Sequence, residues 1–208
     1  MRIAVIGAGN VGSALASSCT RAGHDVVVAS RDASEAEALA AEVGCDAAPD
    51  TDSAVRDAEV VILAVPYPEL DSLVSEIGAE LDGKIVVDVT NRMDPEDMAS
   101  TIDGTSAAEQ LQAKLPRARV VKAFNTAFAS RQAEPEVDGT APDGFVAGDD
   151  ADAKRRVLEL VEQIGFRPID AGPLAMARAL EAMAVLNISL QIANGWSWQM
   201  AWKLIGPA

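Results

Sequence analysis

Three glycines near the start of the chain have the spacing that lets a polypeptide backbone hold a phosphate. Residues 1–12 read MRIAVIGAGNVG, in which an apolar strand runs into Gly7-x-Gly9-x-x-Gly12 and then into a helical pattern. Gly7 permits a tight turn, Gly9 lets phosphate oxygens approach the backbone, and Gly12 lets the helix pack closely on the strand. The N–H groups of the first helical turn would then face the anion. The sequence therefore predicts a dinucleotide site whose pyrophosphate is held by Gly7, Ala8, Gly9, Asn10, Val11 and Gly12.

The end of the second predicted strand indicates which dinucleotide binds, because the ribose 2′ position of the ligand lies there. An NAD enzyme places an acidic residue at this point, about 20 residues after the glycines. Here the strand is followed by Ser30 and Arg31, which can both donate hydrogen bonds to a 2′-phosphate. This favours NADP over NAD. The alternative is that Arg31 is a solvated charge and that Asp32 accepts from the ribose.

Strand-like and helix-like segments alternate along the chain in the order of parallel βαβ units. We therefore predict an α/β fold: a doubly wound, Rossmann-type parallel sheet with C-terminal helices, in a single domain. Residues 1–170 would form the NADP-binding part, and residues 171–208 a helical segment that packs on it and on a dimer partner. The expected strands are 2–6, 25–29, 60–64, 84–89, 119–123, 144–147 and 167–170, the expected helices are 11–22, 34–42, 69–81, 106–115, 151–164 and 174–204 (broken near Gly195), and long loops are expected at 91–105 and 126–143.

Short polar residues follow three consecutive predicted strands. In this architecture ligands bind beyond the carboxyl ends of the strands, so we expect these segments to line one crevice. Their amides and hydroxyls could orient a nicotinamide ribose or carboxamide. Asn, Thr and Pro are also common in turns for local reasons, which leaves a purely structural role open. The candidates for the nicotinamide end are Ala64, Val65, Pro66, Tyr67, Thr90, Asn91, Asn125 and Thr126.

The sequence offers no convincing catalytic acid or base. The only histidine, His24, precedes the second strand and is expected at the end of the sheet away from the cofactor. Hydride exchange between two ring cofactors requires close stacking and exclusion of water rather than a dedicated proton donor. We therefore name no catalytic residue and regard Tyr67, Lys122 and Glu181 as candidates by position only.

Composition narrows the range of partners. The 208 residues include 32 acidic and 17 basic ones, a formal net charge of −15, which makes nucleic acids and anionic membranes poor partners. Self-repulsion of this size suggests a salt-loving host, although an ordinary acidic bacterial enzyme is the alternative. Cys19 and Cys45 form no Cys-x-x-Cys pair and predict buried or half-buried thiols, with no disulfide and no metal. Glycines interrupt the apolar N-terminus, so we expect a soluble cytoplasmic protein rather than a secreted one.

Large adaptable side chains gather in the C-terminal segment, which is expected to be helical. Trp198 and Trp202 are four residues apart and would share one helical face. These side chains could form a homodimer interface, which we favour, or a wall for a second cofactor. The side chains concerned are Met176, Met183, Trp196, Trp198, Met200 and Trp202.

Several motifs in fixed order carry a resemblance to a known family. They are GAGNVG at 7–12, Ser30-Arg31, LAVP at 63–66, VVKAFNT at 120–126, AGDD at 147–150 and DAGPL at 170–174. On these the whole chain resembles the NADPH-dependent coenzyme F420 reductases, whose members transfer hydride between NADP and 8-hydroxy-5-deazaflavin, and the oxidoreductase domain of metalloreductases that pass electrons from NADPH to a flavin.

The resemblance implies that Gly7 to Gly12 hold the pyrophosphate, that Ser30 and Arg31 hold the 2′-phosphate, and that Val65, Thr90 and Asn125 lie near the nicotinamide. The sequence departs from the family at Ala33-Ser34-Glu35, where members carry a further basic residue. A reductase of small imines or carbonyls, and a non-enzymatic NADPH-binding redox sensor, remain as alternatives.

Overall fold

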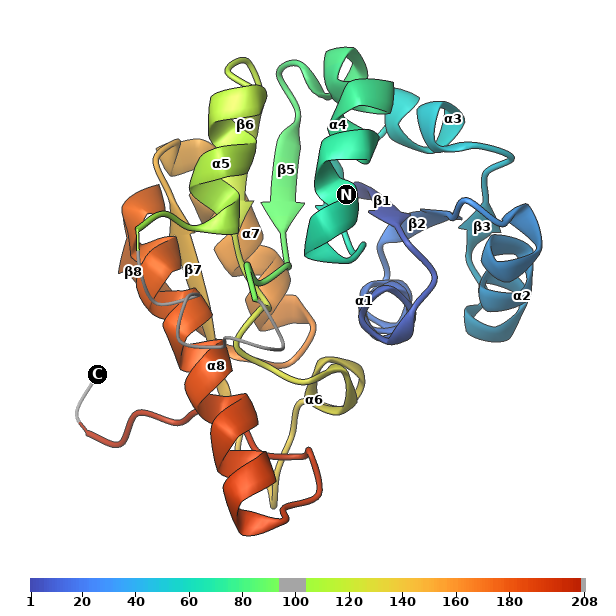
Figure 1. Cartoon of the computed structure of the whole chain (residues 1–208). Helices are drawn as coiled ribbons and strands as arrows, with labels where there is room; N and C mark the ends of the chain where they lie inside the picture. The colour runs from blue at the N-terminus through green and yellow to red at the C-terminus, as the bar shows by residue number, and fades with distance from the viewer. Residues whose placement is uncertain (94–103, 207–208) are drawn as a thin grey trace.

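One mostly parallel sheet organises the chain. The structure is a computed structural model, which describes residues 1–93 and 104–206. Its eight strands are ordered β3-β2-β1-β4-β5-β6-β7-β8, with helices on both faces (Figure 1). This confirms the predicted Rossmann-type α/β fold. The strands are β1 (Arg2–Ile6), β2 (Asp25–Ala29), β3 (Asp46–Ala47), β4 (Val60–Leu63), β5 (Ile85–Asp88), β6 (Arg119–Lys122), β7 (Asp143–Gly148) and β8 (Arg167–Gly172).

Side-chain caps fix where several of the helices begin. Asp32, Asp50 and Asp150 each accept a backbone N–H from the first turn of the helix that follows, and Ser106 forms a capping box with Glu109. The α-helices are α1 (Asn10–Arg21), α2 (Ala33–Val43), α3 (Thr51–Arg56), α4 (Leu70–Ile77), α5 (Ala107–Lys114), α6 (Ala129–Ala133), α7 (Ala151–Gln163) and α8 (Ala177–Asn194), and the short 3₁₀ segments are η1 (Tyr67–Glu69), η2 (Gly78–Leu81) and η4 (Leu174–Met176).

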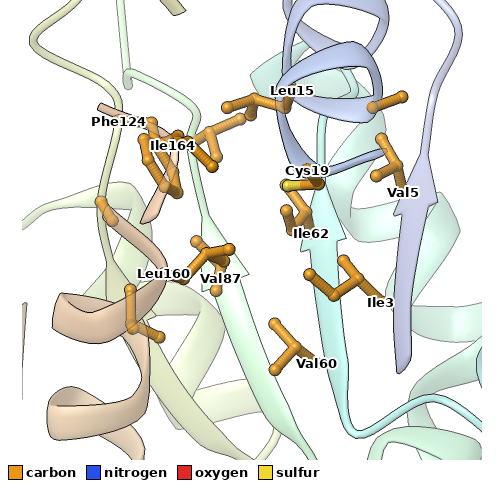
Figure 2. Close-up of a cluster of buried hydrophobic side chains, with 14 of the residues drawn as sticks. Ile3, Val5, Leu15, Cys19, Val60, Ile62, Val87, Phe124, Leu160 and Ile164 are labelled. Carbon is orange, nitrogen blue, oxygen red and sulfur yellow. The ribbon is translucent and has the colours of Figure 1, made fainter. Parts of the chain in front are cut away.

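The central strands are buried on both faces, which explains their nearly unbroken Val, Ile and Leu content. Alternate residues of each strand enter two different cores. One core joins Ile3, Val60 and Val87 with α1, α2 and α7, and ten of its side chains are labelled in Figure 2. The other core joins the opposite face of the strands with α3, α4 and α5. The sheet between these layers places the carboxyl ends of its six mutually parallel strands, β1 to β6, at one edge.

The last two strands reverse the direction of the sheet. The six strands from β3 to β6 are parallel, whereas β7 pairs antiparallel with β6 and parallel with β8. The prediction of a wholly parallel order is therefore wrong at β7 and β8. A parallel return requires a crossover across the face of the sheet. The link between β6 and β7 instead packs its short helix α6 against α1, where Ser18 Oγ donates to the Gln132 carbonyl at 2.5 Å.

The C-terminal helix ends at the break expected near Gly195 but does not resume in the described residues after it. It stops at Asn194 because Gly195 adopts the left-handed conformation (φ 62°) and caps it. The expectation that Trp198 and Trp202 share a helical face is therefore wrong. Trp198 packs edge-on against Phe128, and Trp202 packs against the small core around Phe145 and Leu180.

Sequence reasoning also missed three short elements, β3, α3 and α6, which the expected segments do not include. Most of the long loop expected at 91–105 lies outside the described residues. Within them, only the segment Leu174–Asn194 is long and apolar enough to cross a membrane by composition. Glu181, Asn187 and Gln191 of this segment are buried, so one face of the helix packs on the rest of the domain.

Candidate active site

The three glycines form the tight turn that joins β1 to α1. Gly7 has φ of 113°, and a Cβ at this position would lie 2.4 Å from the Ala64 carbonyl oxygen. A Cβ on Gly12 would lie 1.9 Å from the Gly7 carbonyl oxygen, so no larger residue fits there. Gly9, in contrast, faces open space with no atom within 4 Å of a Cβ. It begins α1 without a side-chain cap, and the first turn of that helix contains no acidic residue. Backbone N–H groups and the helix dipole are thus directed at a place where an anion fits.

A cleft of about 350 Å³ extends from this turn across the ends of β1, β2 and β4. One part of its wall is the glycine turn, and another is formed by residues that follow β4. The residues predicted from the sequence that line it are Gly7, Ala8, Gly9, Ser30, Arg31, Ala64, Val65 and Pro66, and it is also lined by Ile6, Glu35, Thr51, Pro68, Glu69, Ser72, Leu73 and Glu76. We call it the nucleotide cleft. It suits the adenosine and pyrophosphate portions of a dinucleotide.

Both predicted donors to a 2′-phosphate lie in the nucleotide cleft, and each contacts a carboxylate. Ser30 Oγ donates to Glu35 at 3.0 Å, and the Arg31 guanidinium donates to Glu69 at 3.0 Å. Asp32, the alternative ribose acceptor, caps α2 by accepting from the backbone N–H and hydroxyl of Ser34. These hydrogen bonds from Ser34 lower the pKa of Asp32. The Asp32 carboxylate is therefore engaged in helix capping.

A second, smaller cleft of about 150 Å³ lies beside the first turn of α1. It combines that turn with the loops after β5 and β6 and with α8, and none of its lining side chains is an acid or a base. The lining residues are Val11, Val89, Asn91, Asn125, Thr126, Ala127, Phe128, Ala129, Gln132, Ala184, Asn187 and Ile188. We call it the neutral cleft.

An unusual turn after β6 directs the amide of Asn125. Phe124 has φ of 64°, a value that is strained for a bulky residue, and the Asn125 N–H donates to the Ala123 carbonyl at 2.8 Å. Phe124 is held in place by burial and by edge-to-face packing on Phe166. Asn125 Nδ2 donates to Asn91 Oδ1 and to the Leu180 carbonyl, both at 2.9 Å. Strain that the surrounding packing maintains is common at functional sites.

Two residues that line the neutral cleft each carry a buried side-chain oxygen without a hydrogen-bond donor. These oxygens are Asn125 Oδ1 and Gln132 Oε1. The amide nitrogen of Gln132 is fully used, because it donates to the Phe124 and Ala127 carbonyls at 3.0 Å. Buried acceptors are normally satisfied by a protein group, a water or a ligand. A small shift of either side chain toward the cleft would let its oxygen accept from an N–H of a carboxamide or of a heterocyclic ring.

A buried ion cluster ties the strand ends to the C-terminal helix. Lys122 Nζ lies 2.9 Å from both Asp88 Oδ2 and Glu181 Oε1 and also donates to the Thr90 carbonyl, and all three charged side chains are fully buried. Asp88 accepts from the N–H and hydroxyl of Thr90, while Glu181 accepts from the N–H groups of Arg92 and Ala107. The cluster fixes the backbone just before Asn91. Lys122 and Glu181, which were candidates by position only, thus form a buried ion pair with each other.

This chain is similar to a known family and to several known proteins. The family model described as "NADP oxidoreductase coenzyme F420-dependent" matches residues 2–92. The F420-dependent NADP reductase of Methanothermobacter marburgensis is 35% identical over 93% of this chain and 94% of its own length. The chain belongs to this family. Metalloreductase STEAP3 from Rattus norvegicus is 34% identical over 94% of this chain, which spans 38% of the metalloreductase.

Solved structures agree with membership of the F420-dependent NADP reductase family. A protein from Arthrobacter sp. FB24, provisionally assigned as an F420-dependent NADP reductase, has a TM-score of 0.88 at 29% identity and covers 98% of this chain and 99% of its own. An imine reductase from Myxococcus stipitatus has a TM-score of 0.71 at 20% identity and covers 94% of this chain and 63% of its own. That second likeness shows a shared fold only.

Some predicted residues lie outside both clefts of this family member. Asn10 and Gly12 belong to α1 and line neither cleft. Tyr67 donates its hydroxyl to Gln110 Oε1 at 2.7 Å and faces α5, and Thr90 is buried against Asp88. The expected single crevice is divided, since Val65 and Pro66 line the nucleotide cleft whereas Asn91, Asn125 and Thr126 line the neutral cleft.

The remaining candidates for acid-base or metal chemistry lie elsewhere. His24 precedes β2, at the opposite end of that strand from the clefts, and its Nδ1 lies 3.4 Å from the N-terminal amine. Burial raises the pKa of the Cys19 thiol to about 12, and Cys45 is half-buried. The predicted burial of the two cysteines is thus confirmed, and both are free thiols. In the described ranges 1–93 and 104–206, no three His, Cys, Asp or Glu side chains are arranged to hold a metal ion.

Proposed function

We propose that this chain transfers a hydride between NADP(H) and a deazaflavin (coenzyme F420) or a flavin. The observation that carries the proposal is the pairing of two clefts at one helix N-terminus. The nucleotide cleft has the glycine turn and Arg31, while the neutral cleft beside it is lined by uncharged groups. The full-length F420-dependent NADP reductase relatives support the same chemistry.

Each part of the chain has a distinct task in this proposal. The glycine turn binds the pyrophosphate, Ser30 and Arg31 bind the 2′-phosphate, and Asn125 accepts from the nicotinamide carboxamide. The nicotinamide supplies the hydride. Hydride transfer between two rings depends on their close approach and on the exclusion of water. The apolar and amide walls of the neutral cleft suffice for both. No side chain is proposed as a catalytic acid or base.

The test is to mix purified protein with NADPH and one class of acceptor at a time. Loss of NADPH absorbance with a deazaflavin or flavin, and none with small imines or carbonyls, supports the proposal. Turnover of imines or carbonyls alone would replace it with the small-substrate reductase. NADPH binding without turnover of any acceptor would favour a redox-sensing module.

We further propose a homodimer that forms through the C-terminal segment. Apolar side chains remain exposed on α8 and on the chain that follows it, including Leu186, Ile192, Trp196 and Ile205, the last of which is 97% exposed. Exposed apolar patches of this kind are typical of protein interfaces. Sedimentation should give a dimer at micromolar concentration, and a monomer would refute the proposal. Residues 1–170 and 171–208 would then serve nucleotide binding and assembly respectively.

A cytoplasmic location is proposed with the same function. The support is the charge of the chain and the buried polar residues of α8, which suit a water-soluble protein that avoids nucleic acids and membranes. The net charge of −15 also supports the proposal that the host accumulates salt, which screens like charges.

A further inference from the structure

Two glutamates contact the groups that would recognise the 2′-phosphate. Glu35, in the first turn of α2, accepts from Ser30 Oγ at 3.0 Å, and Glu69, in η1, accepts from Arg31 at 3.0 Å. All four side chains line the nucleotide cleft. Neither the spacing of the three glycines nor the residues at the strand ends predicts a role for Glu69. It is 38 residues away from Arg31 in the sequence.

The Arg31–Glu69 pair spans the cleft. Arg31 follows β2 and Glu69 follows β4, and these strands lie on either side of β1 in the sheet. The pair therefore passes over the carboxyl end of β1, where the glycine turn begins. The Arg31 side chain is 82% exposed, so the contact can open at little cost when a ligand enters.

A 2′-phosphate and a 2′-hydroxyl would experience this arrangement differently. The phosphate carries a charge of about −1.5 to −2 and would compete with Glu35 for the Ser30 hydroxyl and with Glu69 for the Arg31 guanidinium. The two carboxylates would also repel it. A ribose 2′-hydroxyl can instead donate to a carboxylate, as in NAD enzymes.

We propose that Glu35 and Glu69 are specificity-determining residues that oppose Arg31 and reduce the preference of this chain for NADP(H) over NAD(H). The inference rests on the proposed function and deepens it. Discrimination between the coenzymes is set by one guanidinium that attracts the 2′-phosphate and by two carboxylates that repel it.

The experiment measures binding of NADPH and NADH to the full chain by calorimetry, in dilute and in molar KCl. The variants are Glu35→Gln and Glu69→Gln, which keep the size of the side chain and its ability to accept a hydrogen bond. Glu37→Gln in α2 and Glu80→Gln in η2 remove the same charge from exposed positions outside the lining of the cleft. Adenosine 2′,5′-bisphosphate and adenosine 5′-monophosphate serve as probes without a nicotinamide.

Glu35→Gln and Glu69→Gln should each tighten the binding of NADPH and of the bisphosphate about 3- to 10-fold in dilute buffer. Binding of NADH and of the monophosphate should stay equal or weaken, and molar KCl should reduce the gain. The two control variants should change each affinity less than about twofold.

Equal shifts for phosphorylated and unphosphorylated ligands, or no shift beyond the controls, would overturn the inference. Failure of the proposed function would give a different result from failure of this inference. If the unaltered chain binds neither NADPH nor NADH, the dinucleotide site itself is wrong, whereas the inference fails only when both bind and the glutamates leave their ratio unchanged.

Discussion

Replacing Lys122 by methionine should destabilise the chain far more than breaking an exposed ion pair. Methionine keeps the length of the apolar stem but removes the ammonium that lies 2.9 Å from both Asp88 and Glu181. Two fully buried carboxylates would then face each other without a cation. Loss of one partner from a buried ion pair costs about 3–5 kcal/mol. The backbone N–H groups that the carboxylates retain from Thr90, Arg92 and Ala107 offset part of the second loss.

The free energy of unfolding should therefore fall by about 3–5 kcal/mol in total. Urea titration followed by tryptophan fluorescence should show a midpoint lower by about 2 M, given a slope of about 2 kcal/mol per molar. Glu181→Gln retains an acceptor for Lys122 and leaves one positive and one negative charge, so it should cost only about 1–2 kcal/mol.

The matched control is Lys114→Met, which breaks the exposed pair with Asp71 and should cost less than about 1 kcal/mol. The reasoning fails if Lys122→Met is no more destabilising than this control, or if Glu181→Gln costs more than Lys122→Met. Should Lys122→Met not yield folded protein while the other two variants do, the predicted order still holds.

Three further predictions address the nucleotide cleft, acid stability and salt. Arg31→Ala should weaken NADPH binding about tenfold and leave NADH nearly unchanged, and an unaltered ratio of the two affinities would exclude Arg31 from the 2′-phosphate site. Hydrogen bonds from Arg178, together with those from Ser106, lower the pKa of Glu109 from 4.5 to about 2, so this carboxylate stabilises the fold above pH 4.5 and loses that effect between pH 4.5 and 2. Arg178→Met should lower the free energy of unfolding near neutral pH and lower it progressively less towards pH 2, and a loss independent of pH in urea titrations would contradict this origin. The thermal midpoint should rise between dilute and molar KCl, and a flat or falling midpoint would argue against the salt-loving host.

Local signals allowed most of the fold to be predicted. The strand-like runs are long and apolar, and the caps at Asp32 and Ser106 lie where the predicted helices begin. The two-residue strand β3 has no such pattern, because Asp46 and Ala47 gain their strand conformation only by pairing with β2. The reversal at β7 depends on how α6 packs against α1, which periodicity cannot reveal.

The candidate site was predictable where neighbours in sequence are neighbours in space. The glycine turn, Ser30 and Arg31 could be predicted because each directly follows one of the first two strands. Glu69 was not predicted, and Glu181 was named by position only, because the contacts of these residues with Arg31 and Lys122 span 38 and 59 residues of sequence. The division of the expected crevice into two clefts depends on α8, whose residues such as Asn187 complete the neutral cleft.

The place of α8 near the end of the chain has a consequence for how the two clefts can change. The nucleotide cleft is lined by residues within the region 2–92 that matches the family model, whereas α8 supplies one wall of the neutral cleft near the end of the chain. Exchange of residues 177–194 for the matching helix of a relative could therefore alter which acceptor is reduced while nucleotide recognition persists. Natural selection or protein engineering could therefore change the electron acceptor without changing the nucleotide cleft.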